Sequence, residues 1–243
     1  MSPSRVVVAA VRALAAAAGR ALSPPSCAGC DEPIADDAVF CADCARTALP
    51  YTERPGAIGV RAADAGLVAF APFAGALAEG IRRFKYSDRP DLARPLGRLL
   101  LCAARDAGVR ADVVVPVPLH PRRLAERGYN QAALLAAHVA DGLAASFAPR
   151  ALRRVRSTAQ QAQLSRDLRL LNVAGAFRAR APERVERRRV ALIDDVATTG
   201  ATLAACRDAL LGAGAASVTY LVVAAAESGA DELRSSPPSA RRT

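Results

Sequence analysis

The chain has 243 residues, 52 % of them hydrophobic and 4 % aromatic, so one α/β domain, with or without a small module, can bury a core of Val, Leu, Ile and Ala. There is no run of 18 apolar residues, so we expect no transmembrane helix. A net charge of +10, from 33 Lys and Arg against 23 Asp and Glu, favours anionic partners such as phosphates, nucleic acid or an acidic membrane surface. Lys85 is the only lysine.

Residues 1–25 predict an amphipathic N-terminal helix, which spans 5–22 and ends at a serine and two prolines. Its apolar residues recur at helical spacing. The same stretch faintly resembles a signal peptide, but Arg12 divides the apolar run into two short pieces. We therefore expect a helix that packs on the body of a cytoplasmic protein.

Four of the six cysteines form a C-x2-C-x10-C-x2-C pattern within residues 26–50. Two such turns can present four thiolates to one tetrahedral Zn²⁺, and a site closed by four protein ligands is structural. Two disulfides, which need an oxidising compartment, and a tetrathiolate iron–sulfur site are the alternatives. Cys102 and Cys206 lie in apolar helical patterns and are expected in the core. The expected metal ligands are Cys27, Cys30, Cys41 and Cys44.

From residue 66 onward, strand and helix patterns alternate. Continuous β-branched strands between helices are typical of a parallel sheet covered on both faces, so the sequence predicts an α/β fold. An irregular link is expected at 51–64, an Arg-rich loop with a short helix near 165–171 at 150–189, and a disordered tail at 227–243. The expected strands span 67–70, 112–118, 189–193 and 217–224, and the expected helices span 74–84, 92–107, 125–145 and 201–211.

A polar loop follows the strand expected at 189–193. It begins with Asp194 and Asp195 and leads through a Thr- and Gly-rich turn into a helix. Ligands of open α/β sheets bind beyond the carboxyl ends of the strands, and a helix N-terminus offers N–H groups and a positive dipole end to a phosphate. Glycine lets the backbone come close to the ligand. The expected phosphate-binding residues are Thr198, Thr199, Gly200, Ala201 and Thr202.

The two carboxylates would repel a bare phosphate, but they suit a phosphate that belongs to a sugar. They can accept hydrogen bonds from ribose hydroxyls, stabilise positive charge near the sugar ring, or hold Mg²⁺. Alternatively, Asp194 and Asp195 only cap the following helix and the threonines form the turn. The whole run, apolar-DD-V-x-T-T-G-x-T, favours a ribose-phosphate site.

This run, VALIDDVATTGAT, resembles the motif with which type I phosphoribosyltransferases bind phosphoribosyl pyrophosphate (PRPP). The segments 84–100, 116–136 and 157–177, together with the cysteine module, resemble the ComF family of competence-associated proteins over most of residues 26–226. The resemblance implies a four-cysteine zinc-binding module at 26–50 and a parallel-sheet, Rossmann-like domain of the type I phosphoribosyltransferase kind at 51–226.

The resemblance also implies roles for individual residues. Asp194 and Asp195 would contact the ribose hydroxyls and act in catalysis, and residues 198–202 would hold the 5-phosphate. Thr198 stands where 6-oxopurine salvage enzymes carry an aspartate base, so purine salvage is disfavoured. The residues that match the pyrophosphate loop, or segments near it, are Val117, Pro118, Arg127 and Asn130. A further match of the family's pattern comprises Gln161, Arg169 and Asn172.

Two functions follow as hypotheses. The first is Mg²⁺-dependent transfer of ribose 5-phosphate from PRPP, or a related phosphorylated ribose, to an unknown acceptor. The alternative is a non-catalytic adaptor in DNA uptake that contacts single-stranded DNA or a helicase. Three interpretations of the stretch 150–189 correspond to these hypotheses. It can be a hood over the phosphates, in which Arg153, Arg154 or Arg156 contacts pyrophosphate. Alternatively, it is a surface that binds nucleic acid, or a solvated basic face. His120 is a weak candidate for substrate contact, and His138 is expected to be structural.

Overall fold

The computed structural model describes residues 25–35, 38–49, 61–62, 66–156 and 175–226. The helix expected at 5–22, the short helix expected near 165–171 and the disordered tail expected at 227–243 lie outside these residues. Within the described part of the chain, no helix is long and apolar enough to cross a membrane.

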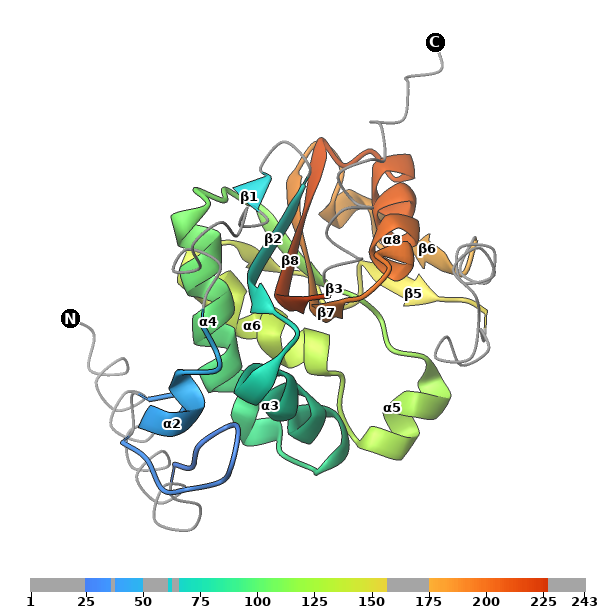
Figure 1. Cartoon of the computed structure of the whole chain (residues 1–243). Coiled ribbons are helices and arrows are strands. Elements are labelled where there is room, and N and C mark those ends of the chain that lie inside the picture. The colour runs from blue at the N-terminus through green and yellow to red at the C-terminus, as the bar shows by residue number, and fades with distance from the viewer. Residues whose placement is uncertain (1–24, 36–37, 50–60, 63–65, 157–174, 227–243) are drawn as a thin grey trace, which may run out of the picture.

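Strands and helices alternate along the chain, largely in the order that the sequence predicts (Figure 1). The strands are β1 (Arg61–Ala62), β2 (Leu67–Pro72), β3 (Val113–Pro116), β4 (Ser146–Phe147), β5 (Leu152–Arg154), β6 (Phe177–Ala179), β7 (Arg189–Ala197) and β8 (Ser217–Ala225). The α-helices are α2 (Ala42–Ala45), α3 (Gly75–Tyr86), α4 (Ala93–Asp106), α5 (Pro121–Arg127), α6 (Gln131–Leu143) and α8 (Ala201–Gly212). Two short 3₁₀ turns are η2 (Pro90–Leu92) and η4 (Pro182–Arg184).

Six strands form one sheet in the order β1-β2-β8-β7-β3-β4. Only β1 runs antiparallel to its neighbour, and the other pairs are parallel. Parallel neighbours require crossover connections, which the helices supply. The predicted α/β fold with a parallel sheet is therefore confirmed, and β7 lies in the sheet's interior between β8 and β3.

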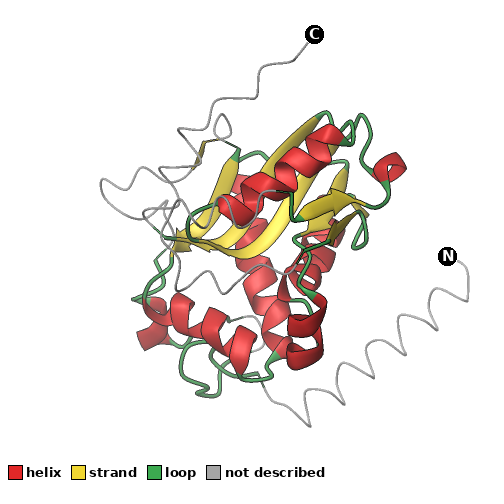
Figure 2. Cartoon of the chain, turned by 90° about the vertical axis from the view of Figure 1, so that its right-hand side faces the viewer, coloured by secondary structure: helices red, strands yellow, loops and turns green. Residues whose placement is uncertain are grey.

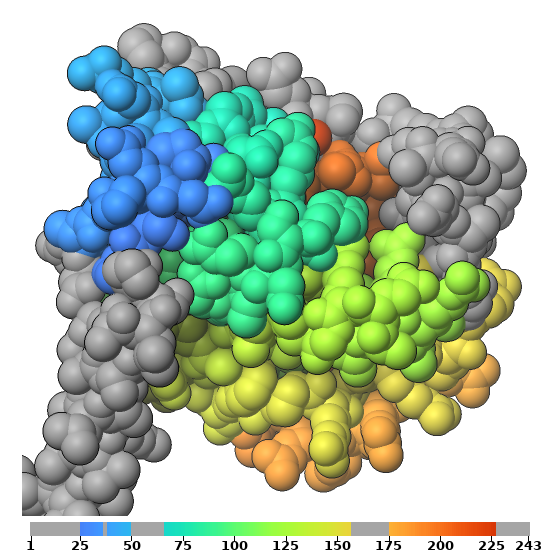
Figure 3. Space-filling view, turned by 90° about the horizontal axis from the view of Figure 1, so that it is seen from below, coloured from blue at the N-terminus to red at the C-terminus, as the bar shows by residue number. Residues whose placement is uncertain are grey.

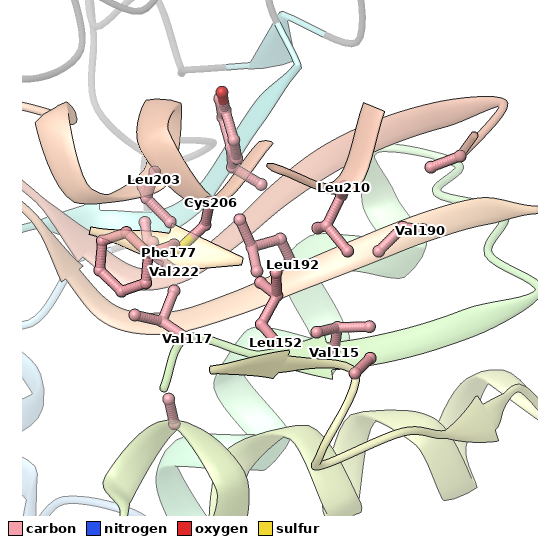
Figure 4. Packing of buried hydrophobic residues seen from close by; sticks show 14 of the residues in the cluster. Val115, Val117, Leu152, Phe177, Val190, Leu192, Leu203, Cys206, Leu210 and Val222 are labelled. Atoms are coloured by element: carbon pink, nitrogen blue, oxygen red, sulfur yellow. The ribbon is translucent and has the colours of Figure 1, made fainter. Parts of the chain in front are cut away.

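The sheet separates two hydrophobic cores because successive side chains of a strand point to opposite faces. Leu192 of β7 lies in the core that α8 and the β5–β6 pair cover (Figure 4). Its neighbour Ile193 lies in the other core, against α3, α4 and α6. Figure 2 shows the sheet with helices on both sides. The side that a residue of β7 faces thus decides which helices it can meet.

The prediction of one continuous helix at 125–145 is wrong, because the chain forms two helices there. Gly128 follows α5 in the left-handed conformation, with φ at 76°. Asn130 then caps α6, since its side-chain oxygen accepts a hydrogen bond of 3.1 Å from the N–H of Ala132. A left-handed glycine stops a helix, and an asparagine cap starts one. These local signals override the continuous Ala- and Leu-rich pattern.

Strand β7 is also longer than expected. Instead of ending at Ile193, it continues to Ala197, which pairs with Ala225 of β8. Asp194 and Asp195 therefore belong to the strand, and the alternation of side chains directs them to opposite faces. Asp194 is on the side of α8, and Asp195 is on the side of α3.

Two further expectations need correction. The stretch 150–189 is not simply a loop, because β5 and β6 form an antiparallel pair in its described part. Cys206 is buried in the core as expected, but Cys102 is exposed. The side chain of Cys102 lies on the outer side of α4, where its Sγ is 3.7 Å from Asp106 Oδ2.

Candidate functional site

A cavity of about 410 Å³ lies at the carboxyl ends of β3 and β7. In the space-filling view the surface is hollowed between α3 and α5, and orange atoms of the C-terminal half lie between them (Figure 3). Most residues predicted for ribose-phosphate or pyrophosphate binding line this one cavity. They are Val117, Pro118, Arg127, Asn130, Arg154, Asp194, Asp195, Thr198, Thr199, Gly200, Ala201 and Thr202.

The floor of the cavity is the turn between β7 and α8. Gly200 caps α8 in the left-handed conformation, with φ at 69°, which a residue with a side chain rarely adopts. The first hydrogen bond of the helix runs from the N–H of Ala204 to the carbonyl of Gly200, at 2.8 Å. Residues 201–203 stand before it, at the N-terminal end of the helix, and they line the cavity. This turn has the properties of an anion site.

The two carboxylates lie in different surroundings. Asp195 is 5 % exposed, and its Oδ1 is 2.8 Å from Lys85 Nζ. Asp194 is half-buried, and its Oδ1 accepts a hydrogen bond of 2.9 Å from the N–H of Asp195. Burial, and then the negative charge of Asp195, raise the pKa of Asp194 to about 7. Near neutral pH the cavity therefore holds one ion-paired carboxylate and one that readily gains or loses a proton.

Lys85 is a site residue that the sequence reasoning missed. Its burial works to lower its pKa, but the charge of Asp195 and the hydrogen bond to it raise the pKa above the ordinary value. Lys85 therefore stays charged and lines the cavity. The sequence did offer one signal. The chain has 33 Lys and Arg residues, and Lys85 is the only one of them that is not Arg.

Helix α5 supplies a basic wall. Arg123 and Arg127 are four residues apart, so both lie on one side of the helix, and both line the cavity. The Arg127 guanidinium lies over the ring of Tyr86, 4.8 Å from its centroid. Arg123 and Tyr86 are lining residues that the sequence did not single out. Positive charge thus faces the two carboxylates across the cavity.

Arg154 reaches the cavity from β5. Its guanidinium lies 5.4 Å from the ring centroid of Phe177 on β6. Burial, and then the positive charge of Arg123, lower the pKa of Arg154. Of the three arginines considered for the hood, Arg153 and Arg156 do not line the cavity in the described part of the chain. The short β5–β6 pair is what fixes the position of Arg154.

The loop after β3 is held by Asn130. The Asn130 side-chain amide donates a hydrogen bond of 3.1 Å to the carbonyl of Val117. The N–H of Val117 bonds to the carbonyl of Ile193 at 2.9 Å, which extends the pairing of β3 with β7. Asn130 therefore both begins α6 and fixes the loop that starts at Val117.

Three candidates from the sequence lie elsewhere or are not placed. His120 caps α5, where its Nδ1 accepts a hydrogen bond of 3.2 Å from the N–H of Arg122, and it does not line the cavity. His138 packs against Gly97 of α4, in agreement with a structural role. Three other residues that match the family's pattern lie outside the described residues, namely Gln161, Arg169 and Asn172.

A second cavity, of about 690 Å³, adjoins the first. The two share part of their lining, namely Lys85, Tyr86, Arg123 and Arg127. Tyr86 is 73 % exposed, and Asp88 and Glu126 add negative charge on the outer side. This arrangement provides a polar approach, with one aromatic ring, to the basic wall of the first cavity.

The four predicted metal ligands also converge. The Sγ atoms of Cys27, Cys30, Cys41 and Cys44 all lie within 4.8 Å of one another, and those of Cys30 and Cys41 are 3.7 Å apart. Four thiolates around one Zn²⁺, at about 2.3 Å each, are about 3.8 Å apart. All six cysteines lie in the described residues and none forms a disulfide. The donor set and spacing fit a tetrathiolate metal site.

The backbone favours the thiolate form of one ligand. Burial works to raise the pKa of Cys27, but hydrogen bonds from backbone N–H groups outweigh it and bring the pKa to about 7. One of these bonds runs from the N–H of Cys41 to Cys27 Sγ, at 3.3 Å. A Cβ at Gly29 would lie 2.9 Å from Cys44 Sγ, so the turn requires a glycine. Metal binding needs deprotonated thiols, and the backbone hydrogen bonds promote that form at Cys27.

Relatives of known name align with much of the chain. DNA utilization protein YhgH of Escherichia coli (strain K12) is 40 % identical over 157 residues, 63 % of this chain and 68 % of that protein. The protein of the same name from Salmonella typhimurium is 34 % identical over 197 residues, 79 % of this chain and 80 % of that protein. Competence protein F of Haemophilus influenzae is 40 % identical over 129 residues, 51 % of this chain and 56 % of that protein. No family model matches the chain.

Two solved enzyme structures align with part of the chain. The allosteric regulatory enzyme of purine biosynthesis aligns with a TM-score of 0.41 at 24 % identity, over 58 % of this chain and 29 % of that one. Glutamine PRPP amidotransferase from B. subtilis aligns with a TM-score of 0.39 at 24 % identity, over 57 % of this chain and 29 % of that one. The chain thus spans less than a third of either enzyme.

Proposed function

This chain belongs to the family of DNA utilization protein YhgH and Competence protein F, and we propose that it binds PRPP and transfers its ribose 5-phosphate group to an acceptor. The observation that carries the proposal is the convergence of an acid pair, a helix N-terminus and a basic wall on one cavity. The proposal keeps the division into a metal-binding module at 26–50 and a phosphoribosyltransferase-like domain at 51–226.

Each part of the cavity has a role in this proposal. The turn of residues 198–202 binds the 5-phosphate through backbone N–H groups and threonine hydroxyls. Asp194 and Asp195 accept hydrogen bonds from the ribose hydroxyls. Because these carboxylates are fixed before substrate arrives, they are positioned for positive charge that develops on the ring during the reaction.

The reaction breaks the bond between C1 of the ribose and a pyrophosphate oxygen, and the electron pair leaves with the pyrophosphate. A lone pair of the acceptor forms the new bond to C1, and the acceptor's proton is released. Arg127, Arg123 and Arg154 neutralise the departing pyrophosphate. Val117 and Pro118, in the loop held by Asn130, lie beside it. Bound Mg²⁺ would be held by Asp194 or Asp195, directly or through water, and would supply charge neutralisation on PRPP.

The second cavity is where the proposal places the acceptor. It reaches the first cavity across Lys85 and Tyr86, on the side of the basic wall. The exposed ring of Tyr86 can stack on a planar acceptor. The Arg127 guanidinium lies over the same ring and adds a positive charge there.

The proposal assigns a structural Zn²⁺ to the cysteine cluster. Its four thiol ligands leave no open position for substrate, so the ion stabilises the module and takes no part in the transfer. A reducing compartment keeps the four thiols from forming disulfides and so leaves them available to the metal. We therefore place the protein in the cytoplasm.

Release of pyrophosphate from PRPP tests the transfer. PRPP labelled in its pyrophosphate is incubated with Mg²⁺, the protein and a panel of acceptors. We expect release by the wild type and by Asp141→Asn, whose side chain is exposed on α6 away from the cavity, and loss of release by Asp194→Asn/Asp195→Asn. Equal release by the wild type and the double variant would contradict the assigned site.

The names of the relatives favour one second candidate, an adaptor that binds nucleic acid during DNA uptake or processing. The net charge of +10 supports it. Binding of fluorescent single-stranded DNA would be measured across a range of salt concentrations. Affinity that falls steeply with salt, and equally in the wild type and Asp194→Asn/Asp195→Asn, would support the adaptor role.

A further inference from the structure

The cysteine module is fastened to α3, the helix that carries Lys85. Asp31 directly follows the ligand Cys30, and its Oδ2 is 2.5 Å from Nη1 of Arg83 on α3. Its other oxygen pairs with Arg89, which also donates a hydrogen bond of 2.9 Å to Ser26 Oγ. The arginine side chains are about one-fifth exposed, so these contacts are partly shielded from water. Figure 1 shows the module beside α3.

The module also contacts the beginning and the middle of α3. Thr47 Oγ1 accepts a hydrogen bond of 3.1 Å from the N–H of Ala76, in the first turn of the helix. In the middle, a Cβ at Gly80 would lie 3.2 Å from both the Cβ and the carbonyl oxygen of Ala28. The module therefore lies against α3 along most of its length.

The last turn of α3 is held from the opposite side by the segment that follows α5. The carbonyl of Phe84 accepts a hydrogen bond of 2.8 Å from the Tyr129 hydroxyl and another of 3.2 Å from Gln131 Nε2. Gln131 is 3 % exposed and Phe84 is fully buried. The backbone next to Lys85 is thus fixed by two donors.

Arg83 and Lys85 are two residues apart, so their side chains leave the helix in directions about 200° apart. Arg83 pairs with Asp31 of the module, and Lys85 pairs with Asp195 at the floor of the cavity, at 2.8 Å. One turn of helix therefore joins the metal site to the acid pair. A rotation or shift of α3 at the module acts on the Lys85 ammonium through this turn, and the two hydrogen bonds to the carbonyl of Phe84 oppose it.

We propose that Lys85 is a positioning residue, which holds the Asp195 carboxylate in the geometry that binds the ribose, and that the metal-loaded cysteine module sets the position of Lys85 through α3. This inference rests on the proposed function for its effect on PRPP. Loss of the metal, or of the Asp31 contact, weakens the attachment of the module to the last turn of α3 and loosens the ion pair. The Asp195 carboxylate then lacks a fixed cation beside it. PRPP binding weakens by about tenfold, which is typical of coupling between two sites.

The sole lysine gives a direct probe. In full-length, zinc-loaded protein labelled with ¹⁵N at lysine Nζ, the only labelled ammonium is that of Lys85. Its ion pair with Asp195 should slow hydrogen exchange and make the signal observable. We expect Asp31→Asn to shift this signal, to speed its exchange, and to weaken PRPP binding by about tenfold, since the cation is no longer held.

The matched control is Asp43→Asn. Asp43 belongs to the same module and also pairs with an arginine, Arg46 at 3.2 Å, but both side chains are exposed and neither touches α3 through this contact. The control should leave the lysine signal and PRPP affinity at wild-type values. An unchanged signal in Asp31→Asn, with zinc still bound, would overturn the proposal, as would equal effects of the two variants.

Two further arms separate the possible failures. If Asp31→Asn fails to fold, Arg83→Met removes the Asp31–Arg83 contact from the side of the helix, together with the pair of Arg83 with Glu79 on the same helix, and leaves the module's sequence intact; the same two outcomes apply. Lys85→Met should weaken PRPP binding and Lys85→Arg should restore part of it, as positioning by charge requires. If no variant binds PRPP while the lysine signal still responds to Asp31→Asn, the proposed function is wrong and the coupling stands.

Discussion

The cavity and the cysteine cluster differ in what holds their polar groups in place. The groups of the cavity come from α3, α5, α6, β5, β7 and α8, and the sheet and its two cores support these elements. The cluster draws its four ligands from residues 27–44, where the described residues include the start of one short helix, α2. The first site is supported by the fold, whereas the second depends on its metal.

The largest expected effect comes from removal of that metal. Cys27→Ser/Cys41→Ser should abolish binding of one Zn²⁺ and unfold the module, because structural zinc supplies on the order of 10 kcal/mol to the folding of such a unit. Hydrogen exchange should become fast at 25–49 and stay slow in β7 and β8. If β7 and β8 lose protection to the same extent, the two regions are not supported separately.

The next effect lies in the buried ion pair. Lys85→Met leaves Asp195 without its cation in a place that is 5 % exposed, so we expect a loss of about 3 kcal/mol in the free energy of unfolding. Urea unfolding at pH 8 measures it. The double variant Lys85→Met/Asp195→Asn should recover most of the loss, because the uncompensated charge is gone. A double variant as unstable as Lys85→Met would show that packing, not charge, is responsible.

A smaller effect is expected at the break between α5 and α6. Asn130→Ala removes the cap of α6 and the hydrogen bond to Val117, which together should cost about 1–2 kcal/mol. Thermal unfolding measures the loss, and Asn130→Asp, which keeps the capping oxygen, serves as the control. Equal stability of the alanine variant and the wild type would mean that neither bond matters.

The smallest effect concerns pH. Folding raises the pKa of Asp194 to about 7, so its charge opposes folding once the pH exceeds the ordinary aspartate range, and the full penalty is present above about pH 7. Asp194→Asn should therefore have a higher Tm than the wild type at pH 8, and the difference should shrink as the pH falls toward 4. A Tm difference that does not change with pH would contradict the raised pKa.

The same contrast explains what the sequence could predict. The cysteine cluster and the turn after β7 depend on residues close together in the chain, so spacing and periodicity were sufficient for both. The fold class followed from continuous apolar strands between helices. The pairing of Lys85 with Asp195 could not be predicted, because it depends on how α3 packs on the sheet.

Errors in the expected boundaries had local and non-local causes. The break at Gly128 and Asn130 was visible in principle, since both residue types are common at helix ends, but the apolar pattern ran through it. The extension of β7 through Asp194 and Asp195 depends on pairing with β8, which no local pattern shows. The β5–β6 pair depends likewise on contact with α8.

The central claim is that the cavity binds a ribose bearing a 5-phosphate, and calorimetric titration with PRPP tests it most directly. The titrations are run with and without Mg²⁺ on the wild type, on Asp194→Asn/Asp195→Asn, and on Asp141→Asn as the control. We predict binding that Mg²⁺ strengthens in the wild type and the control and that is lost in the double variant. No binding by folded, zinc-loaded wild type, or binding that the double variant retains in full, would contradict the claim.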